Sequence, residues 1–292
     1  MEWRQFVINL GAIEPGQVEE VLCRHGAHSV TVSAASDEAI LEPAPGTTPL
    51  WSDIRMSALF SADADFSLLR ADLRQTLAVE TLPAHSVEPL PDRAWEREWL
   101  KDFRPMRFGD RLWVCPQGFD IDADDAIVVR LDPGLAFGTG SHATTALCLE
   151  WLDSREMKGK TLLDVGCGSG ILAIAALKLA ARAATAVDND LQAIMATRQN
   201  ALVNGVDSRL VTTMQFDQLD EQFDFVVANI LAATLVDQAD RICKHLKPGG
   251  ELALSGILAE QLEQVSAAYR HCVDFREPSY RDEWACLSGT KV

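Results

Sequence analysis

The sequence predicts a small ferredoxin-like α+β domain at residues 1–90 and a doubly wound, Rossmann-like α/β domain at residues 106–292. Strand-like and helix-like segments alternate from Thr161 to the end of the chain, which is typical of a parallel sheet covered by helices. A glycine-rich turn at residues 166–170 joins an apolar strand to a helix. Between the two predicted domains, prolines and charged residues interrupt the alternation of strands and helices, so we predict a linker helix at residues 91–105.

The first 90 residues fit a fold of two helices packed on an antiparallel sheet of about four strands. The expected strands are 3–10, 28–33, 39–42, 54–60 and 84–88, and the expected helices are 15–25 and 66–79. Asp65 is placed to cap the second helix. Four leucines recur there at helical spacing and are expected in the core: Leu68, Leu69, Leu73 and Leu77. RNA-binding modules share this architecture, but their aromatic and basic strand residues are missing, which favours protein recognition.

The linker contains a short helix-like piece, 95–100, with Trp95 and Trp99 one helical turn apart on one face. This spacing fits a packed joint or a hinge. The strands expected after it are 112–115, 127–131, 161–163, 185–187, 226–229, 251–255 and two near Val273 and Ala285. The helices expected between them are 144–153, 171–183, 191–203 and 258–269.

The turn after strand 161–163 is the most informative motif. It reads Asp-Val-Gly-Cys-Gly-Ser-Gly over residues 164–170, whereas dinucleotide sites normally have the spacing G-x-G-x-x-G. The glycines permit positive φ and close approach of a ligand, and the helix behind them presents free N–H groups. Asp164 at the strand tip would repel a pyrophosphate but suits the cationic amino group of a methionine moiety. The turn therefore indicates S-adenosylmethionine.

A second acidic residue, Asp188, ends the next apolar strand about 20 residues further on, where a carboxylate can accept ribose hydroxyls. Asp188 can also cap the helix that follows, a role that Asn189 or Asp190 would fill equally well. Ligands of open α/β sheets lie at the carboxyl ends of strands, and Gly170, Asp188 and Asn229 all fall at such ends. These features together are typical of a class I methyltransferase.

The net charge of −17 argues against naked nucleic acid as a substrate, because nucleic-acid binders gain affinity from Lys and Arg. Residues 1–90 hold five Lys or Arg against thirteen Asp or Glu, a net charge of −8. A basic protein partner fits this balance, and plain solubility explains it equally well.

Seven cysteines are scattered without C-x-x-C pairing, so we expect reduced thiols, no disulfide framework and no metal site. No stretch approaches the ~18 apolar residues of a membrane helix, and the first residues do not resemble a signal peptide. We therefore expect a cytoplasmic protein without a membrane partner. No coiled-coil or repeat pattern indicates assembly, so a monomer is expected.

Two further segments stand where chemistry can occur: LDPGLAFGTGSHATT at 131–145 and VVANILA at 226–232. With DVGCGSGILAIAALKL at 164–179 and WEREWLKDFRPMRFGDRLWVCP at 95–116, they resemble the bacterial ribosomal protein methyltransferase family PrmA, which modifies the stalk-base protein L-eleven. The resemblance runs through nearly the whole chain. Ala143 and the pair Asn189–Asp190 differ from the residues that the family often has there, which leaves the helix-start geometry open.

This resemblance implies S-adenosylmethionine-dependent N-methylation of L-eleven, at its N-terminal α-amine and at lysine side chains, with the N-terminal domain holding this basic protein. The cofactor contacts that it implies are Thr145, Gly166, Asp188 and Asn229. The chemistry of the turn adds Asp164 and Gly168. A loop expected to close over the cofactor contains Phe137, Gly138 and Thr139, although an ordinary helix-capping turn would look similar.

The implied reaction is an in-line displacement in which a neutral amine attacks the sulfonium methyl carbon, so the enzyme mainly orients the reactants. Asn229 is the candidate catalytic residue, because its side-chain oxygen can accept N–H bonds from the amine. His142 could act as a base, but a histidine near a helix start is more often structural. Three alternatives remain: a methyltransferase for another protein or small amine, a nicotinamide oxidoreductase, and a catalytically silent interaction module.

Overall fold

The computed structural model describes residues 3–36, 38, 40, 47, 49–90, 104–116, 118–123, 125–131 and 140–292. The chain divides into two compact units, Met1–Glu98 and Trp99–Val292. This division falls inside the segment 91–105 that was predicted as a linker. The helix expected at 95–100 lies outside the described residues.

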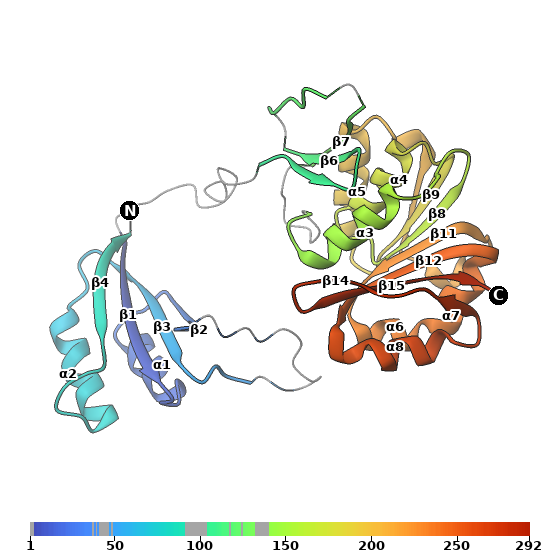
Figure 1. Ribbon diagram of the computed structural model, residues 1–292. Helices are drawn as coiled ribbons and strands as arrows, with labels where there is room; N and C mark the ends of the chain where they lie inside the picture. The colour runs from blue at the N-terminus through green and yellow to red at the C-terminus, as the bar shows by residue number, and fades with distance from the viewer. Residues whose placement is uncertain are drawn as a thin grey trace. The chain divides into compact units, whose positions relative to one another are not determined.

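The described part of the first unit is a four-stranded antiparallel sheet covered by two helices on one face (Figure 1). Its elements are β1 (Trp3–Gly11), α1 (Gly16–Arg24), β2 (Ser29–Ala34), β3 (Ile54–Ser61), α2 (Phe66–Leu77) and β4 (His85–Leu90). The strand order β2-β3-β1-β4 is the predicted ferredoxin-like arrangement. Of the strand expected at 39–42, only Ile40 is described, and it lies outside any strand.

The helices of this unit bury one stripe each against the sheet. Asp65 caps α2 as predicted, because its carboxylate accepts a hydrogen bond from the Ser67 N–H at 2.8 Å. Leu69 and Leu73 are buried, but Leu68 is 61% exposed. The expectation that Leu68 belongs to the core is wrong, because each helical residue is turned about 100° from the one before it and Leu68 falls outside the apolar stripe.

The second unit contains a small sheet followed by alternating strands and helices. Its first elements are β5 (Met106–Phe108), β6 (Leu112–Cys115), β7 (Ile127–Arg130) and α3 (Ala143–Asp153). Then come β8 (Thr161–Val165), α4 (Ile171–Lys178), β9 (Ala183–Val187), α5 (Leu191–Val203), β10 (Leu210–Thr213) and β11 (Phe223–Asn229). The last are α6 (Ala232–Asp237), α7 (Ala239–His245), β12 (Leu246–Leu258), α8 (Leu262–Tyr269), β13 (Val273–Phe275), β14 (Ser279–Arg281) and β15 (Trp284–Lys291).

Among the described residues of this unit, the main sheet has the order β10-β9-β8-β11-β12-β15-β13, with β14 beside β15. The strands from β10 to β12 are parallel, and β15 is antiparallel to β12 and β13. The chain builds outwards from β8 through β9 and β10, and then returns to build the other side from β11. Strand order therefore reverses between β8 and β11, which is where open α/β sheets bind ligands.

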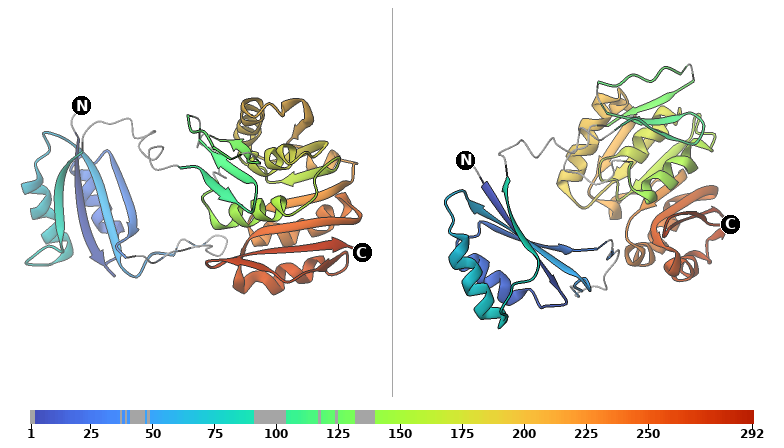
Figure 2. Two further views of the ribbon diagram at one scale, coloured as in Figure 1. Left: turned by 45° about the horizontal axis from the view of Figure 1, so that its top comes forward. Right: turned by 60° about the vertical axis from the view of Figure 1, so that its left-hand side comes forward.

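Helices cover both faces of this sheet (Figures 1 and 2). α3, α4 and α5 pack on one face, and α6, α7 and α8 pack on the other. The small sheet β5-β6-β7 joins the first of these cores through Phe108 and Val129. The predicted doubly wound fold is thus confirmed. No helix in the described part of the chain is long and apolar enough to cross a membrane.

Candidate cofactor and active site

The glycine turn after β8 is shaped by backbone conformations that only glycine adopts easily. Gly166, Gly168 and Gly170 have φ values of 73°, 53° and 78°. The N–H groups of Gly166 and Cys167 donate to the Val187 carbonyl at 2.8 and 3.0 Å, which fastens the turn to the end of β9. A Cβ atom on Gly166 would clash with the Ile230 side chain. The turn is therefore closely packed against Ile230 and fastened to β9 at the point where strand order reverses.

Asp188, at the end of β9, is held by this turn. Its Oδ2 accepts from the Gly168 N–H at 2.9 Å, and its Oδ1 accepts from the Asp190 N–H at 3.0 Å. A carboxylate offers about four lone-pair sites, so each oxygen keeps one for a ligand hydroxyl. The cap of α5 is Asp190, which accepts from the Gln192 N–H at 2.8 Å. Of the candidates for that cap, the structure thus selects Asp190 and leaves Asp188 facing the turn.

Asp164 lies beneath the turn, with 1% of its surface exposed. Its Oδ2 accepts from the Ala173 N–H at 3.1 Å, whereas its Oδ1 has no hydrogen-bond partner among the described residues. Burial, together with the nearby charge of Asp188, raises the pKa of Asp164 from 3.8 to about 7, although the Ala173 hydrogen bond opposes the shift. A cationic group near this carboxyl would favour its ionised form.

A cavity of about 440 Å³ opens beside the turn, at the carboxyl ends of β8, β9, β10 and β11. Its lining includes Gly166, Asp188, Met214, Phe216 and Gln238. This volume and the mixture of apolar surface with few polar groups are typical of small-molecule sites. Gln238 also lines the cavity, and its buried Oε1 atom has no hydrogen-bond partner among the described residues.

Asn229 ends β11, the strand next to β8. Its Nδ2 donates to the Thr145 hydroxyl at 3.2 Å, which leaves the side-chain oxygen as an acceptor. Thr145, on α3, is 1% exposed. The structure thus shows it as the hydrogen-bond partner of Asn229, and its contact with the cofactor stays a prediction. His142 is the N-cap of α3 and packs edge-on against Trp284 with ring centroids 5.0 Å apart. The structural interpretation of His142 thus has support.

The structure brings Gly166, Gly168 and Asp188 together in one hydrogen-bonded unit and places Asp164 directly below it. Asn229 and Thr145 form a second unit. Three residues of the predicted closing loop lie outside the described residues: Phe137, Gly138 and Thr139.

Sequence reasoning missed the cavity wall that follows β10. Met214 and Phe216 belong to it, as do Gln238 and Arg241, which follow β11 in the other half of the sheet. One signal could have found Met214 and Phe216, because β10 ends at the same edge as β9 in a parallel sheet. The contributions of Gln238 and Arg241 depend on how α6 and α7 pack.

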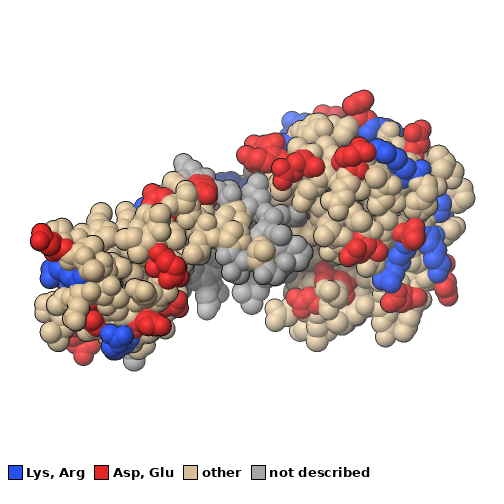
Figure 3. Space-filling model, turned by 90° about the horizontal axis from the view of Figure 1, so that it is seen from below, with Lys and Arg blue, Asp and Glu red and all other residues tan. Residues whose placement is uncertain are grey.

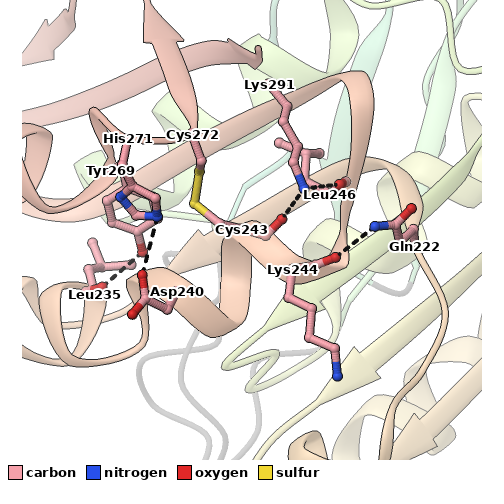
Figure 4. The surroundings of a disulfide bond; sticks show 10 residues. All are labelled: Gln222, Leu235, Asp240, Cys243, Lys244, Leu246, Tyr269, His271, Cys272 and Lys291. Atoms are coloured by element: carbon pink, nitrogen blue, oxygen red, sulfur yellow. Dashed lines mark hydrogen bonds and ion pairs between the residues drawn. A yellow bond between two sulfur atoms is a disulfide. The ribbon is translucent and has the colours of Figure 1, made fainter.

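One expectation about the cysteines is wrong. Cys243, on α7, and Cys272, before β13, form a disulfide with Cα atoms 6.4 Å apart (Figure 4). They are 29 residues apart in the chain, so their spacing in the sequence does not predict that they pair. The potential ligand atoms of Cys243, His271 and Cys272 lie within 4.8 Å of one another, but with both sulfurs joined neither is a free thiolate for a metal ion.

The reversal of strand order, the glycine turn, the paired Asp188 and the strand-end Asn229 define a class I methyltransferase, the class that uses S-adenosylmethionine. Residues 2–292 match the family described as Ribosomal protein L11 methyltransferase (PrmA), and the chain belongs to this family.

Two relatives match the sequence over its whole length. The sequence is 49% identical over 292 residues to the ribosomal protein L11 methyltransferase of Ectopseudomonas mendocina. It is 48% identical over 292 residues to the protein of that name from Azotobacter vinelandii, and both matches cover 100% of each chain. The solved structure of a ribosomal protein L11 methylase from Lactobacillus delbrueckii subsp. bulgaricus superposes with a TM-score of 0.60 at 32% identity, covering 65% of this chain and 99% of that one.

Proposed function

We propose that this protein transfers methyl groups from S-adenosylmethionine to amino groups of ribosomal protein L11, at the N-terminal α-amine and at lysine side chains. The observation that carries the proposal is the cavity at the strand-order reversal, where Asp188 keeps one lone-pair site on each oxygen and Asn229 ends the adjoining strand. A sugar with two neighbouring hydroxyls and an amine nucleophile are the partners that these groups suit.

The residues of the glycine turn fit the cofactor in three ways. The Asp188 carboxylate can accept both ribose hydroxyls without breaking its bonds to Gly168 and Asp190. Gly166 lines the cavity and has no side chain of its own, so a ligand can lie against its backbone. Asp164 is buried at the end of β8, next to the cavity-lining residues Val165 and Gly166, so a cationic amino group bound there would favour its ionised form.

The opposite part of the cavity fits the base of the cofactor. Met214 and Phe216 supply apolar surface, and the Gln238 side chain lines the same part of the cavity. The loop containing Phe137, Gly138 and Thr139, together with Thr145, is proposed to complete the enclosure, as in the sequence prediction.

The catalytic work of the chain is orientation. S-adenosylmethionine supplies, when bound, a methyl group on a cationic sulfur. Thr145 fixes the Asn229 amide by accepting its N–H at 3.2 Å, so the Asn229 oxygen can accept an N–H bond from the substrate amine and direct its lone pair. The amine must be neutral to react, which requires a lysine with a pKa near ~10.4 to lose a proton first.

We infer that residues 1–90 recognise the basic substrate and that residues 106–292 carry out the transfer. Acidic side chains are more frequent than basic ones on the face of residues 1–90 that Figure 3 shows, in line with their net charge of −8. This charge favours a basic protein over nucleic acid or an anionic membrane surface. For its location and oligomeric state we propose a cytoplasmic monomer.

The proposal is tested by the intact mass of unmodified L11 after incubation with the enzyme and S-adenosylmethionine. We expect additions of whole methyl masses with the native enzyme, and their loss with Asp188→Ala and Asn229→Ala. Asp190→Asn is the matched control, because an amide can still cap α5 through its oxygen. Binding of S-adenosylhomocysteine without any mass change on L11 would refute the substrate but keep the cofactor.

A further inference from the structure

The cavity wall that follows β10 is held in place by α7, a helix from the other half of the sheet. The wall contains the short turn Phe216–Gln218, and both Phe216 and Asp217 line the cavity. Two residues of α7, Arg241 and His245, are four positions apart and so lie on one face of the helix. Both contact Phe216.

Arg241 reaches the wall through two contacts. Its Nη2 pairs with Asp217 Oδ1 at 2.6 Å, and its Cζ lies 5.4 Å from the centre of the Phe216 ring. This distance lies within the range of a cation–π interaction. Arg241 itself lines the cavity, so the guanidinium, the ring and the carboxylate form one continuous patch of its surface.

His245 supports the same ring from the buried side of α7. Its imidazole stacks on Phe216 with centroids 5.2 Å apart and planes inclined by 30°. His245 is 2% exposed, and its Nδ1–H donates to the Glu221 carbonyl at 2.9 Å, which fixes the orientation of the imidazole. A further bond joins the same segment to α7, from Gln222 Nε2 to the Lys244 carbonyl at 3.0 Å (Figure 4).

These contacts bear on ligand affinity because a wall that is already ordered loses little freedom when the ligand arrives. Phe216 belongs to a connecting segment between β10 and β11, and such segments are mobile unless other elements hold them. Phe216 packs against the core on this face of the sheet, and the two ring contacts described for it, with Arg241 and His245, come from α7.

We propose that Arg241 and His245 are positioning residues that hold Phe216 and Asp217 as a preformed wall for the base of the cofactor. They set the affinity for S-adenosylmethionine and take no part in methyl transfer. This inference rests on the proposed function, because it needs the cavity to be the cofactor site.

The Arg241–Asp217 pair is exposed, at 39% and 75% of the side-chain surfaces, so its loss should hardly change stability. An effect on ligand affinity without an effect on folding therefore separates a positioning role from a structural one. Arg270, the residue after α8, offers the matched control, since it makes a comparable exposed ion pair with Glu263 at 2.8 Å.

The experiment measures three quantities for full-length Arg241→Met, Arg241→Lys and Arg270→Met. These are the Kd for S-adenosylhomocysteine by calorimetry, kcat on L11 at saturating cofactor, and the melting temperature without ligand. Arg241→Met should raise Kd about 3- to 10-fold and leave kcat and the melting temperature nearly unchanged. Arg241→Lys should lie between, because it keeps the charge and loses the planar contact. Arg270→Met should behave as the native enzyme.

Asp217→Asn provides a second variant that weakens the same pair from the other side, and it should raise Kd in the same direction. An unchanged Kd in both Arg241→Met and Asp217→Asn, while Asp188→Ala weakens binding, would overturn the positioning role and leave the cofactor site in place. A fall in kcat at unchanged Kd would also overturn it. If Asp188→Ala binds S-adenosylhomocysteine as the native protein does, the proposed site and the inference fall together.

Discussion

Replacing Asp164 with asparagine should stabilise the ligand-free protein at neutral and alkaline pH. Asparagine has nearly the same shape, and its side-chain oxygen can still accept the Ala173 N–H bond that Asp164 accepts at 3.1 Å. It cannot ionise, so it removes the cost of a buried charge that has no hydrogen-bond partner at Oδ1 among the described residues.

The magnitude follows from the pKa of Asp164, which burial raises from 3.8 to about 7. At 1.36 kcal/mol per pKa unit, the difference corresponds to about 4 kcal/mol. The pKa of Asp164 is higher in the folded state than in the unfolded state. Its burial therefore costs no stability below pH 4, where the carboxyl is protonated in both states, and the free energy of unfolding falls as the pH rises towards 7. Above that pH the loss is complete and constant.

The assay is urea unfolding of the native protein and Asp164→Asn at several pH values between 4 and 8, without ligand. The free energy of unfolding of the variant, minus that of the native protein, should grow by up to about 4 kcal/mol over this range. The native protein should also bind S-adenosylhomocysteine more tightly than the variant does at pH 8. The same difference in unfolding free energy at pH 5 and pH 8 would refute the reasoning.

Two further variants test the turn and the amide. Gly166→Ala should lower the free energy of unfolding by about 1–3 kcal/mol, because φ is 73° and Ile230 blocks a Cβ. Gly205→Ala is the control, because Gly205 has a similar φ of 65° but open space where a Cβ would stand, so it measures the cost of backbone strain alone. If both variants lose the same free energy of unfolding in the urea titration, the Ile230 side chain moves aside at no cost. Thr145→Val should lower kcat several-fold at saturating cofactor, because it releases the Asn229 amide; a raised Kd for S-adenosylhomocysteine with unchanged kcat would instead mark Thr145 as a cofactor contact.

Local signals carried most of what the sequence could predict. The glycines of the turn and Asp188 stand within 25 residues of one another, and their strand–turn–helix context is itself local. The helix expected at 191–203 is observed with these bounds as α5, and Asp190 caps its N-terminus. α4 ends at Lys178, five residues before the end expected at 183, since Ala180 adopts a left-handed φ of 75°.

Features that depend on long-range packing were beyond the sequence. Phe216 becomes part of the cavity only because Arg241 and His245 meet it from a helix more than 20 residues away. The pairing of Cys243 with Cys272 likewise needs α7 and the start of β13 to lie side by side. Neither the periodicity of the hydrophobic residues nor any motif predicts these tertiary contacts.

The Cys243–Cys272 disulfide turns part of the chain into a covalent ring. This ring runs from α7 through β12 and α8 to the start of β13, and β12 is hydrogen-bonded on both sides within the sheet. A protease that cuts at the exposed residues Ala259 and Glu260 opens the ring without releasing a fragment. The nicked protein therefore keeps its full mass in denaturant until a reductant separates the two pieces.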